Sequence, residues 1–272
     1  MVMYNEEDYK KEQKKILDKI EKLEAKAKKR LKRLRQDTSE SMRSLVVMFF
    51  ADYSKDGVID YHTVTTTKEK KLRKFDLVRR YHMEGIAVPF VAHEKMSVID
   101  ALKHNLYFEL VALSQRERDV IDAITKDVYE MNAKNRDYKA DLDPLYKNAV
   151  ALLDRLTQTL EQSLVRKDSK ESIISYLIGY FERIDQRNTD RILYTEDTRA
   201  LSESIRDLFE DDYPTYHIET MRDDRVCQHC KEIEKTPFPF VDAKVGVNYP
   251  PLHPYCRCIV VPENSIPEGV QL

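Results

Sequence analysis

The chain has 272 residues, of which 42% are hydrophobic and 35% are charged, so it is long enough for about two domains with real cores. A formal net charge of −2 gives no global attraction to nucleic acid, and no apolar run approaches the ~20 residues needed to span a bilayer. Five glycines supply no glycine-rich phosphate loop, which excludes dinucleotide-binding and P-loop enzymes. The charged first residues predict neither a signal peptide nor a membrane anchor.

The distribution of proline predicts a boundary near residue 213. Only Pro89 and Pro144 precede it, so the earlier part can form long helices, while loops and short strands are expected after it. We therefore expect a mainly α protein, in which an N-terminal multi-helix region is followed by a small α+β module that cysteine and histidine residues hold together. The predicted parts are an N-terminal helical arm with a basic helix and an extended segment (1–96), a helical domain (97–212) and the Cys/His-containing module (213–272).

The first predicted helix combines an amphipathic stripe, running from Ile16 to Leu34, with a strongly basic face. Eight basic residues and one acidic residue lie between Lys22 and Arg35. One interpretation is a solvated helix face, and the other is a surface that contacts phosphate or an acidic protein. The candidate DNA- or partner-binding residues are Lys26, Lys28, Lys29, Arg30, Lys32, Arg33 and Arg35.

Capping residues predict where the remaining helices begin. The predicted starts are Asp37 with Glu40, Ser97, Ser114 with Glu117, Asp143 with Pro144, Asp168 with Glu171, and Thr189. Residues 58–67 are rich in Val, Ile, Thr and Tyr, which favours a strand or an extended linker. Residues 68–80 are again basic and are expected to form a second helix.

All four cysteines lie between Cys227 and Cys258, which indicates one local site. Cys227 and Cys230 form a Cys-x-x-Cys knuckle, and a tetrahedral zinc ion would need two further ligands from a second segment. We expect these to be His253 and Cys256, with Cys258 as the alternative ligand, in a structural site with no open position for hydrolysis. The other interpretations are disulfides, or free thiols packed as small apolar groups.

The segments around these cysteines resemble a known family. The chain reads Arg-Asp-Asp-Arg-Val-Cys-x-x-Cys from Arg222, then Pro-Pro-Leu-His-Pro-x-Cys-Arg-Cys from Pro250. With the upstream run from Arg191 through Thr195 and Glu196, this pattern resembles the C-terminal domain of phage head morphogenesis proteins, the Mu protein F-like family, over roughly residues 145–262. The family usually has a glycine turn soon after the second cysteine. Here Ile233-Glu234-Lys235 occupies that position, where a left-handed turn costs lysine about 1 kcal/mol more than glycine.

The resemblance implies a non-enzymatic minor capsid protein of a tailed phage, present in the head interior of the virion and in the host cytoplasm during assembly. Its implied partners are the portal protein and the major capsid or scaffold protein, with double-stranded DNA as a further contact. Neither a membrane nor a small-molecule substrate is expected.

Arg191, Thr195, Glu196 and Arg257 are expected to be structural motif positions. The charges of Arg191, Glu196, Arg222 and Arg257 could also belong to an enzyme, but we interpret them as internal salt bridges that position the helix against the cysteine module. Two other functions compete with this one: a zinc-containing DNA-binding or regulatory protein, and an enzyme such as a toxin or a nuclease. The sequence offers neither a base-reading helix beside the knuckle nor a catalytic cluster.

Overall fold

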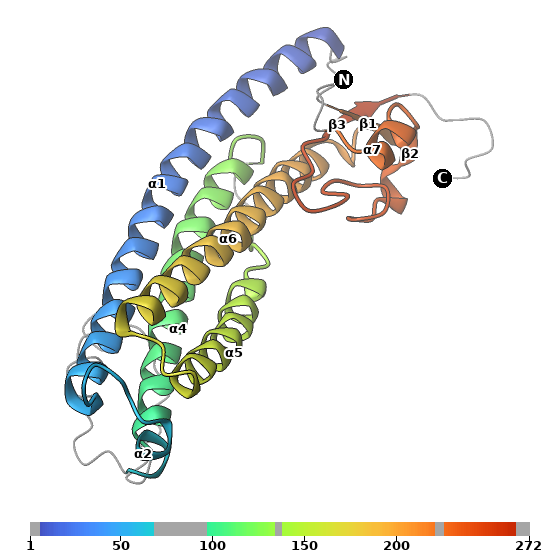
Figure 1. Cartoon of the computed structure of the whole chain (residues 1–272). Coiled ribbons are helices and arrows are strands. Elements are labelled where there is room, and N and C mark those ends of the chain that lie inside the picture. The colour runs from blue at the N-terminus through green and yellow to red at the C-terminus, as the bar shows by residue number, and fades with distance from the viewer. Residues whose placement is uncertain (1–5, 68–96, 134–137, 221–225, 265–272) are drawn as a thin grey trace. The chain divides into compact units, whose positions relative to one another are not determined.

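The computed structural model describes residues 6–67, 97–133, 138–220 and 226–264 (Figure 1). The described helices are α1 (Glu6–Tyr53), α2 (Tyr61–Thr66), α4 (Val98–Tyr129), α5 (Asp143–Val165), α6 (Lys170–Phe209), α7 (Gln228–Ile233) and the 3₁₀ helix η1 (Phe240–Asp242). Three strands, β1 (Thr215–Glu219), β2 (Phe238–Pro239) and β3 (Ile259–Glu263), form one antiparallel sheet in the order β2-β1-β3. The predicted mainly α class, with a small α+β region near the C-terminus, is confirmed.

The chain forms two compact units, and the long helices α1, α4 and α6 contribute residues to both. Unit 1 comprises Met1–Lys29, Val120–Asp141 and Asp190–Leu272, and unit 2 comprises Arg30–Asp119 and Leu142–Thr189. The predicted three-part division at residues 96 and 212 stays a prediction. None of the helices in the described ranges is both long and apolar enough to cross a membrane.

The core of unit 2 follows from the apolar stripes of its helices. On α5, Leu152, Leu156 and Leu160 recur at four-residue steps and are buried against Leu106 of α4 and Phe181 of α6 within one cluster. Such burial supplies the hydrophobic stabilisation that isolated helices lack. The basic stripe of α1 also enters this unit, where the buried Arg35 places its Nε 2.7 Å from a carboxylate oxygen of Asp185.

In unit 1, strand β1 lies at the centre of the sheet and is buried over its first four residues. Thr215 pairs with Glu263 and Glu219 pairs with Ile259, so β3 runs antiparallel along the whole of β1. The fully buried Tyr216 packs against aromatic side chains of the following loop, including Tyr249 at a ring-centroid distance of 5.1 Å. This aromatic cluster forms the core of the small C-terminal module.

Two of the predicted helix starts need correction because they lie inside the first two long helices. Asp37 lies in α1, which continues unbroken to Tyr53, and Ser114 lies in α4. The Ser114 hydroxyl donates a hydrogen bond of 2.8 Å to the carbonyl of Val111 in its own helix, so it has a partner without acting as an N-cap.

The predicted start at Thr189 is wrong for a related reason. Thr189 lies within α6, and its buried hydroxyl donates 3.1 Å to Glu117 of α4. A residue suited to capping can remain inside a helix when a neighbouring helix supplies its partner.

At other starts the prediction is confirmed or moves by a residue or two. The Ser97 hydroxyl accepts a hydrogen bond from the backbone N–H of Asp100 at 3.2 Å, as a cap of α4 should. Leu142, and not Asp143, is the N-cap of α5, so the Asp-Pro pair lies within the first turn of the helix. At α6 the Ser169 hydroxyl, rather than Asp168, accepts from the backbone N–H of Ser172.

The expected strand or linker at residues 58–67 is wrong, because residues 61–66 form α2. The Asp60 carboxylate accepts from the backbone N–H of Thr63 at 2.9 Å, and this N-cap outweighs the β propensity of the segment. The second basic helix expected at residues 68–80 lies outside the described residues.

Candidate functional site

The cysteine knuckle is built by the short helix α7. Cys227 is the N-cap of this helix, and its Sγ accepts a hydrogen bond from the backbone N–H of Cys230 at 3.4 Å. This turn directs both sulfurs toward one point, where His253 Nε2 lies 3.2 Å from each Sγ. The structure thus brings together three of the four predicted ligands from two distant segments.

The orientation of His253 suits a metal ligand. Its Nδ1 lies 2.8 Å from the carbonyl oxygen of Pro254, which can only accept, so Nδ1 carries the ring proton. The lone pair of Nε2 is therefore directed to the two sulfurs. A backbone carbonyl that fixes the tautomer in this way is a common feature of metal-binding histidines.

A second group of sulfurs adjoins the first and shares Cys230. The sulfurs of Cys230, Cys256 and Cys258, all buried, lie within 4.8 Å of one another. A hydrogen bond from the Cys258 thiol, helped by backbone N–H groups, lowers the pKa of Cys256 to about 5. Burial raises the pKa of Cys230 to about 12. Cys256 is therefore held as a thiolate, the form that binds metals.

The donor set fits zinc and does not fit a hard cation. Sulfur and imidazole nitrogen are ligands that zinc prefers, whereas calcium and magnesium take oxygen. None of the four cysteines, all of which are described, forms a disulfide. The Cys/His clusters could hold a metal ion, with Cys227, Cys230 and His253 in one group and Cys256 and Cys258 joined to it through Cys230.

The residues of the sequence motif, namely the knuckle, the histidine and the second cysteine pair, thus lie close together in the structure. A comparison with known protein families tests the resemblance that this motif suggested. Residues 154–261 match the family described as Phage Mu protein F like protein. This segment is similar to that family. The resemblance drawn from the motifs is thereby confirmed, over less than half of the chain, and the family is one of phage head morphogenesis proteins. No curated protein and no solved structure showed significant similarity to the chain.

Hydrogen bonds to backbone carbonyls attach the Mu F-like cysteine module to the helices of unit 1. The Thr198 hydroxyl of α6 donates a hydrogen bond of 2.6 Å to the carbonyl of Cys256. The Tyr249 hydroxyl donates one of the same length to the carbonyl of Ser202 in α6. From α1, the Tyr9 hydroxyl donates 2.8 Å to the carbonyl of Val260 on β3. Sequence reasoning missed these three anchors because their partners are carbonyls, which leave no mark in a sequence.

The four matched motif residues have different surroundings. Arg191 is exposed, and Thr195 donates 2.7 Å to the Arg191 carbonyl one turn earlier. Glu196 is buried, accepts from the backbone N–H of Asp141 at 2.9 Å and lies 3.6 Å from Arg199. Arg257 lies on the cysteine segment and lowers the pKa of Glu24 electrostatically, although burial of Glu24 outweighs this effect.

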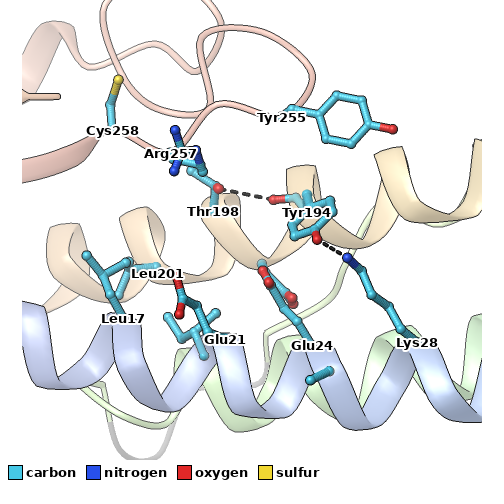
Figure 2. A pocket seen from close by; sticks show the side chains of 13 residues that line it. Leu17, Glu21, Glu24, Lys28, Tyr194, Thr198, Leu201, Tyr255, Arg257 and Cys258 are labelled. Carbon is cyan, nitrogen blue, oxygen red and sulfur yellow. Dashed lines mark hydrogen bonds between the residues drawn. The ribbon is translucent and has the colours of Figure 1, made fainter. Parts of the chain in front are cut away.

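A cavity of about 490 Å³ lies beside the cysteine module, between α1, α6 and the segment 255–258 of unit 1 (Figure 2). Its lining contains three carboxylates, on Glu21, Glu24 and Asp197, and two cations, on Lys28 and Arg257. Lys28 donates to the hydroxyl of Tyr194. The cavity therefore combines charged groups with the apolar walls of two helices.

Asp197 is the unusual member of this lining. Its side chain is 1% exposed, and within the described residues neither carboxylate oxygen has a hydrogen-bond partner. Burial, with smaller contributions from Glu24 and Glu196, raises the pKa of Asp197 well above its usual value. The sequence did carry a signal, because Asp197 stands midway between the buried Leu193 and Leu201 on one helical stripe.

The candidate basic surface of α1 divides into exposed and internal residues. Five of the seven candidates are exposed, namely Lys26, Lys29, Arg30, Lys32 and Arg33. The other two are used inside the protein, since Lys28 is bonded to Tyr194 and Arg35 is paired with Asp185. We call the five exposed residues the α1 basic surface.

Proposed function

We propose that this chain is a structural, non-enzymatic head protein of a tailed phage, associated with the portal in the head interior. The observation that carries the proposal is the Mu F-like match over residues 154–261, which encloses every predicted metal ligand and all of the sheet except the last two residues of β3. A site whose donors are all protein side chains has an architectural role, because it leaves no position for a substrate. Assembly would take place in the host cytoplasm, with the portal and the major capsid or scaffold protein as partners.

The composition of purified particles tests the core of this proposal. Mass spectrometry of the DNA-filled heads of the phage that encodes this chain should detect it at a few copies per head. Heads made without its gene should show reduced packaging or delivery of DNA. Absence of the chain from both procapsids and filled heads would refute the proposal, whatever the metal content of the purified protein.

A structural zinc ion is the second part of the proposal, with Cys227, Cys230, His253 and Cys256 as ligands. Its support is the group that Cys227, Cys230 and His253 form, the place of Cys256 in a second group that shares Cys230, and the tautomer that Pro254 imposes on the ring. When bound, zinc would link α7 to the segment that carries His253. Such a link would add to the aromatic core of the small module and would contribute to its folding free energy.

The third part is contact between packaged DNA and the α1 basic surface. Lys26, Lys29 and Arg33 follow one another at three- and four-residue steps, so they project from one side of the helix. A row of exposed cations of this kind suits a phosphate backbone and carries no base specificity.

Duplex DNA binding over a range of salt concentrations tests this contact. Changing all five residues of the α1 basic surface to glutamine should weaken binding at low salt and reduce the slope of log K against log salt by up to about 4. The matched control changes five exposed lysines outside α1 to glutamine, namely Lys55, Lys139, Lys147, Lys167 and Lys231. Equal loss in both variants would show a charge effect without a defined surface and would contradict the proposed site.

The zinc-containing DNA reader is not favoured by the geometry. Helix α7 has six residues, and it places Cys230 inward on the site. Its long polar side chains suited to base edges are those of Gln228, Lys231 and Glu232, all within little more than one turn, whereas a recognition helix presents such residues over a longer face.

A further inference from the structure

The cavity beside the cysteine module is lined in part by the buried carboxyl group of Asp197, whose ionisation its surroundings oppose. Asp197 is buried, lines the cavity and has no hydrogen-bond partner in the described part of the chain. The charged groups that act on it most strongly, Glu24 and Glu196, are both acidic. Leaving a buried carboxylate without a partner costs stability, so its retention on an apolar stripe calls for a ligand.

The chemistry of the lining defines that ligand. The lining carries three carboxyl groups and two cations, so full ionisation would leave one negative charge in excess. Burial raises the pKa values of Glu24 and Asp197, and a cationic guest would favour their ionised forms. Leu17, Ile20 and Leu201 supply apolar wall suited to methylene groups. We propose that this cavity binds one alkylammonium group, either a lysine side chain of a partner protein or a free aliphatic amine, with Asp197 as its counter-ion.

Aromatic side chains of the cavity support a cationic guest. The rings of Tyr194 and Tyr255 lie 5.6 Å apart between centroids, and both line the cavity. The ammonium of Lys28 lies 4.3 Å from the centroid of the Tyr194 ring and donates to its hydroxyl, so these aromatic residues already lie beside one ammonium group. Figure 2 shows the Lys28 side chain directed to Tyr194, and Tyr255 lies above Tyr194 in this view, on the side away from Lys28.

A divalent metal ion fits the same cavity less well. Among the described residues, the groups of three donors within 4.8 Å of one another are those of the cysteine site, and the carboxylates of Glu21, Glu24 and Asp197 form no such group. Magnesium and calcium need several close oxygen ligands in a defined geometry. A single buried carboxylate with apolar and aromatic walls instead matches an ammonium head on an aliphatic chain. The inference does not depend on the proposed head function.

Isothermal titration calorimetry of the full-length protein with n-butylammonium, with n-butanol as its uncharged analogue, tests the proposal. We expect saturable butylammonium binding in the millimolar range and at least about tenfold weaker binding of butanol. Asp197→Asn should weaken butylammonium binding at least about tenfold, and Glu24→Gln should weaken it less. Asp211→Asn, which changes an exposed aspartate of the same unit, is the matched control and should bind like the wild type.

Further arms separate the sources of the ammonium group. N-acetyl-lysine amide that binds as tightly as butylammonium identifies a partner's lysine as the natural occupant, whereas binding of butylammonium alone identifies a free amine. Three results would overturn the inference: no saturable binding of either amine up to about 100 mM, unchanged binding by the folded Asp197→Asn protein, or displacement of butylammonium by equimolar magnesium. Far-ultraviolet circular dichroism of each variant establishes that it is folded.

Discussion

Asp197→Asn is expected to stabilise the protein, by an amount that depends on pH. The wild-type carboxyl is buried, and its pKa in the folded state lies well above its usual value. A carboxyl with a raised folded pKa binds more protons in the folded than in the unfolded state, so stability is full below about pH 4, the unfolded pKa, and falls as pH rises toward the folded pKa. Asparagine has nearly the same shape and carries no charge, so it does not incur this loss.

The magnitude follows from the same linkage. The advantage of the asparagine variant should be small near pH 4 and should grow by up to about 1.4 kcal/mol per pH unit above it. Between pH 4 and pH 7 this upper limit amounts to about 4 kcal/mol. Loss of the Asp197 charge should also reduce the repulsion on its neighbours Glu24 and Glu196, which acts in the same direction.

Urea unfolding followed by circular dichroism at a series of pH values measures this difference, with Asp211→Asn as the exposed control. The reasoning fails if Asp197→Asn destabilises the protein near neutral pH, or if its advantage is the same at acidic and neutral pH. A stabilised variant that has also lost alkylammonium binding would mean that the wild type gives up stability for a binding site.

Three further predictions concern the metal site, a strained turn and a buried ion pair. The purified protein should contain about one zinc per chain, and chelation should lower its melting temperature. Cys230→Ser removes the sulfur that both donor groups share and should abolish zinc binding. Full zinc content in this variant would exclude the proposed site. Lys235 has a φ of 63°, so the left-handed turn is present although lysine replaces the glycine that is usual in the family. Lys235→Gly should therefore raise the unfolding free energy by about 0.5–1 kcal/mol. A lower unfolding free energy of this variant in urea would contradict the prediction. Arg35→Ala should lower the unfolding free energy by about 3 kcal/mol because it breaks a buried ion pair. The control Arg33→Ala removes an exposed charge and should change stability little. Equal effects of the two variants would argue against the burial of Arg35.

The helical content and the convergence of the cysteine segments could be predicted because both depend on local patterns. Apolar residues at three- and four-residue steps bury one face of each helix, and Leu156 and Leu160 are indeed in the core. The spacing of Cys227 and Cys230 allows one turn to direct two sulfurs toward a point, and the motif containing His253 supplied the partner segment. The family resemblance depended on these same residues.

The helix boundaries could not be predicted with the same success, because a capping residue has more than one use. Thr189 has the composition of an N-cap, yet its hydroxyl is bonded to Glu117 on another helix, so α6 continues through it. The β propensity of residues 58–67 was likewise outweighed by one side-chain cap, Asp60. A sequence lists the donors and acceptors but not the partner that each will meet.

The sequence by itself determined the helical stripes, the position of the cysteine pairs and the Mu F-like character, because each arises from side chains at short, fixed spacings along the chain. Only the tertiary structure decided which cations of α1 are exposed and which carboxylate is buried without a partner. Lys28, Arg35 and Asp197 look like ordinary charged residues in the sequence, and their roles depend on neighbours from distant segments. The electrostatic energy of a charge is fixed by its solvent exposure and by the charges around it, and folding sets both.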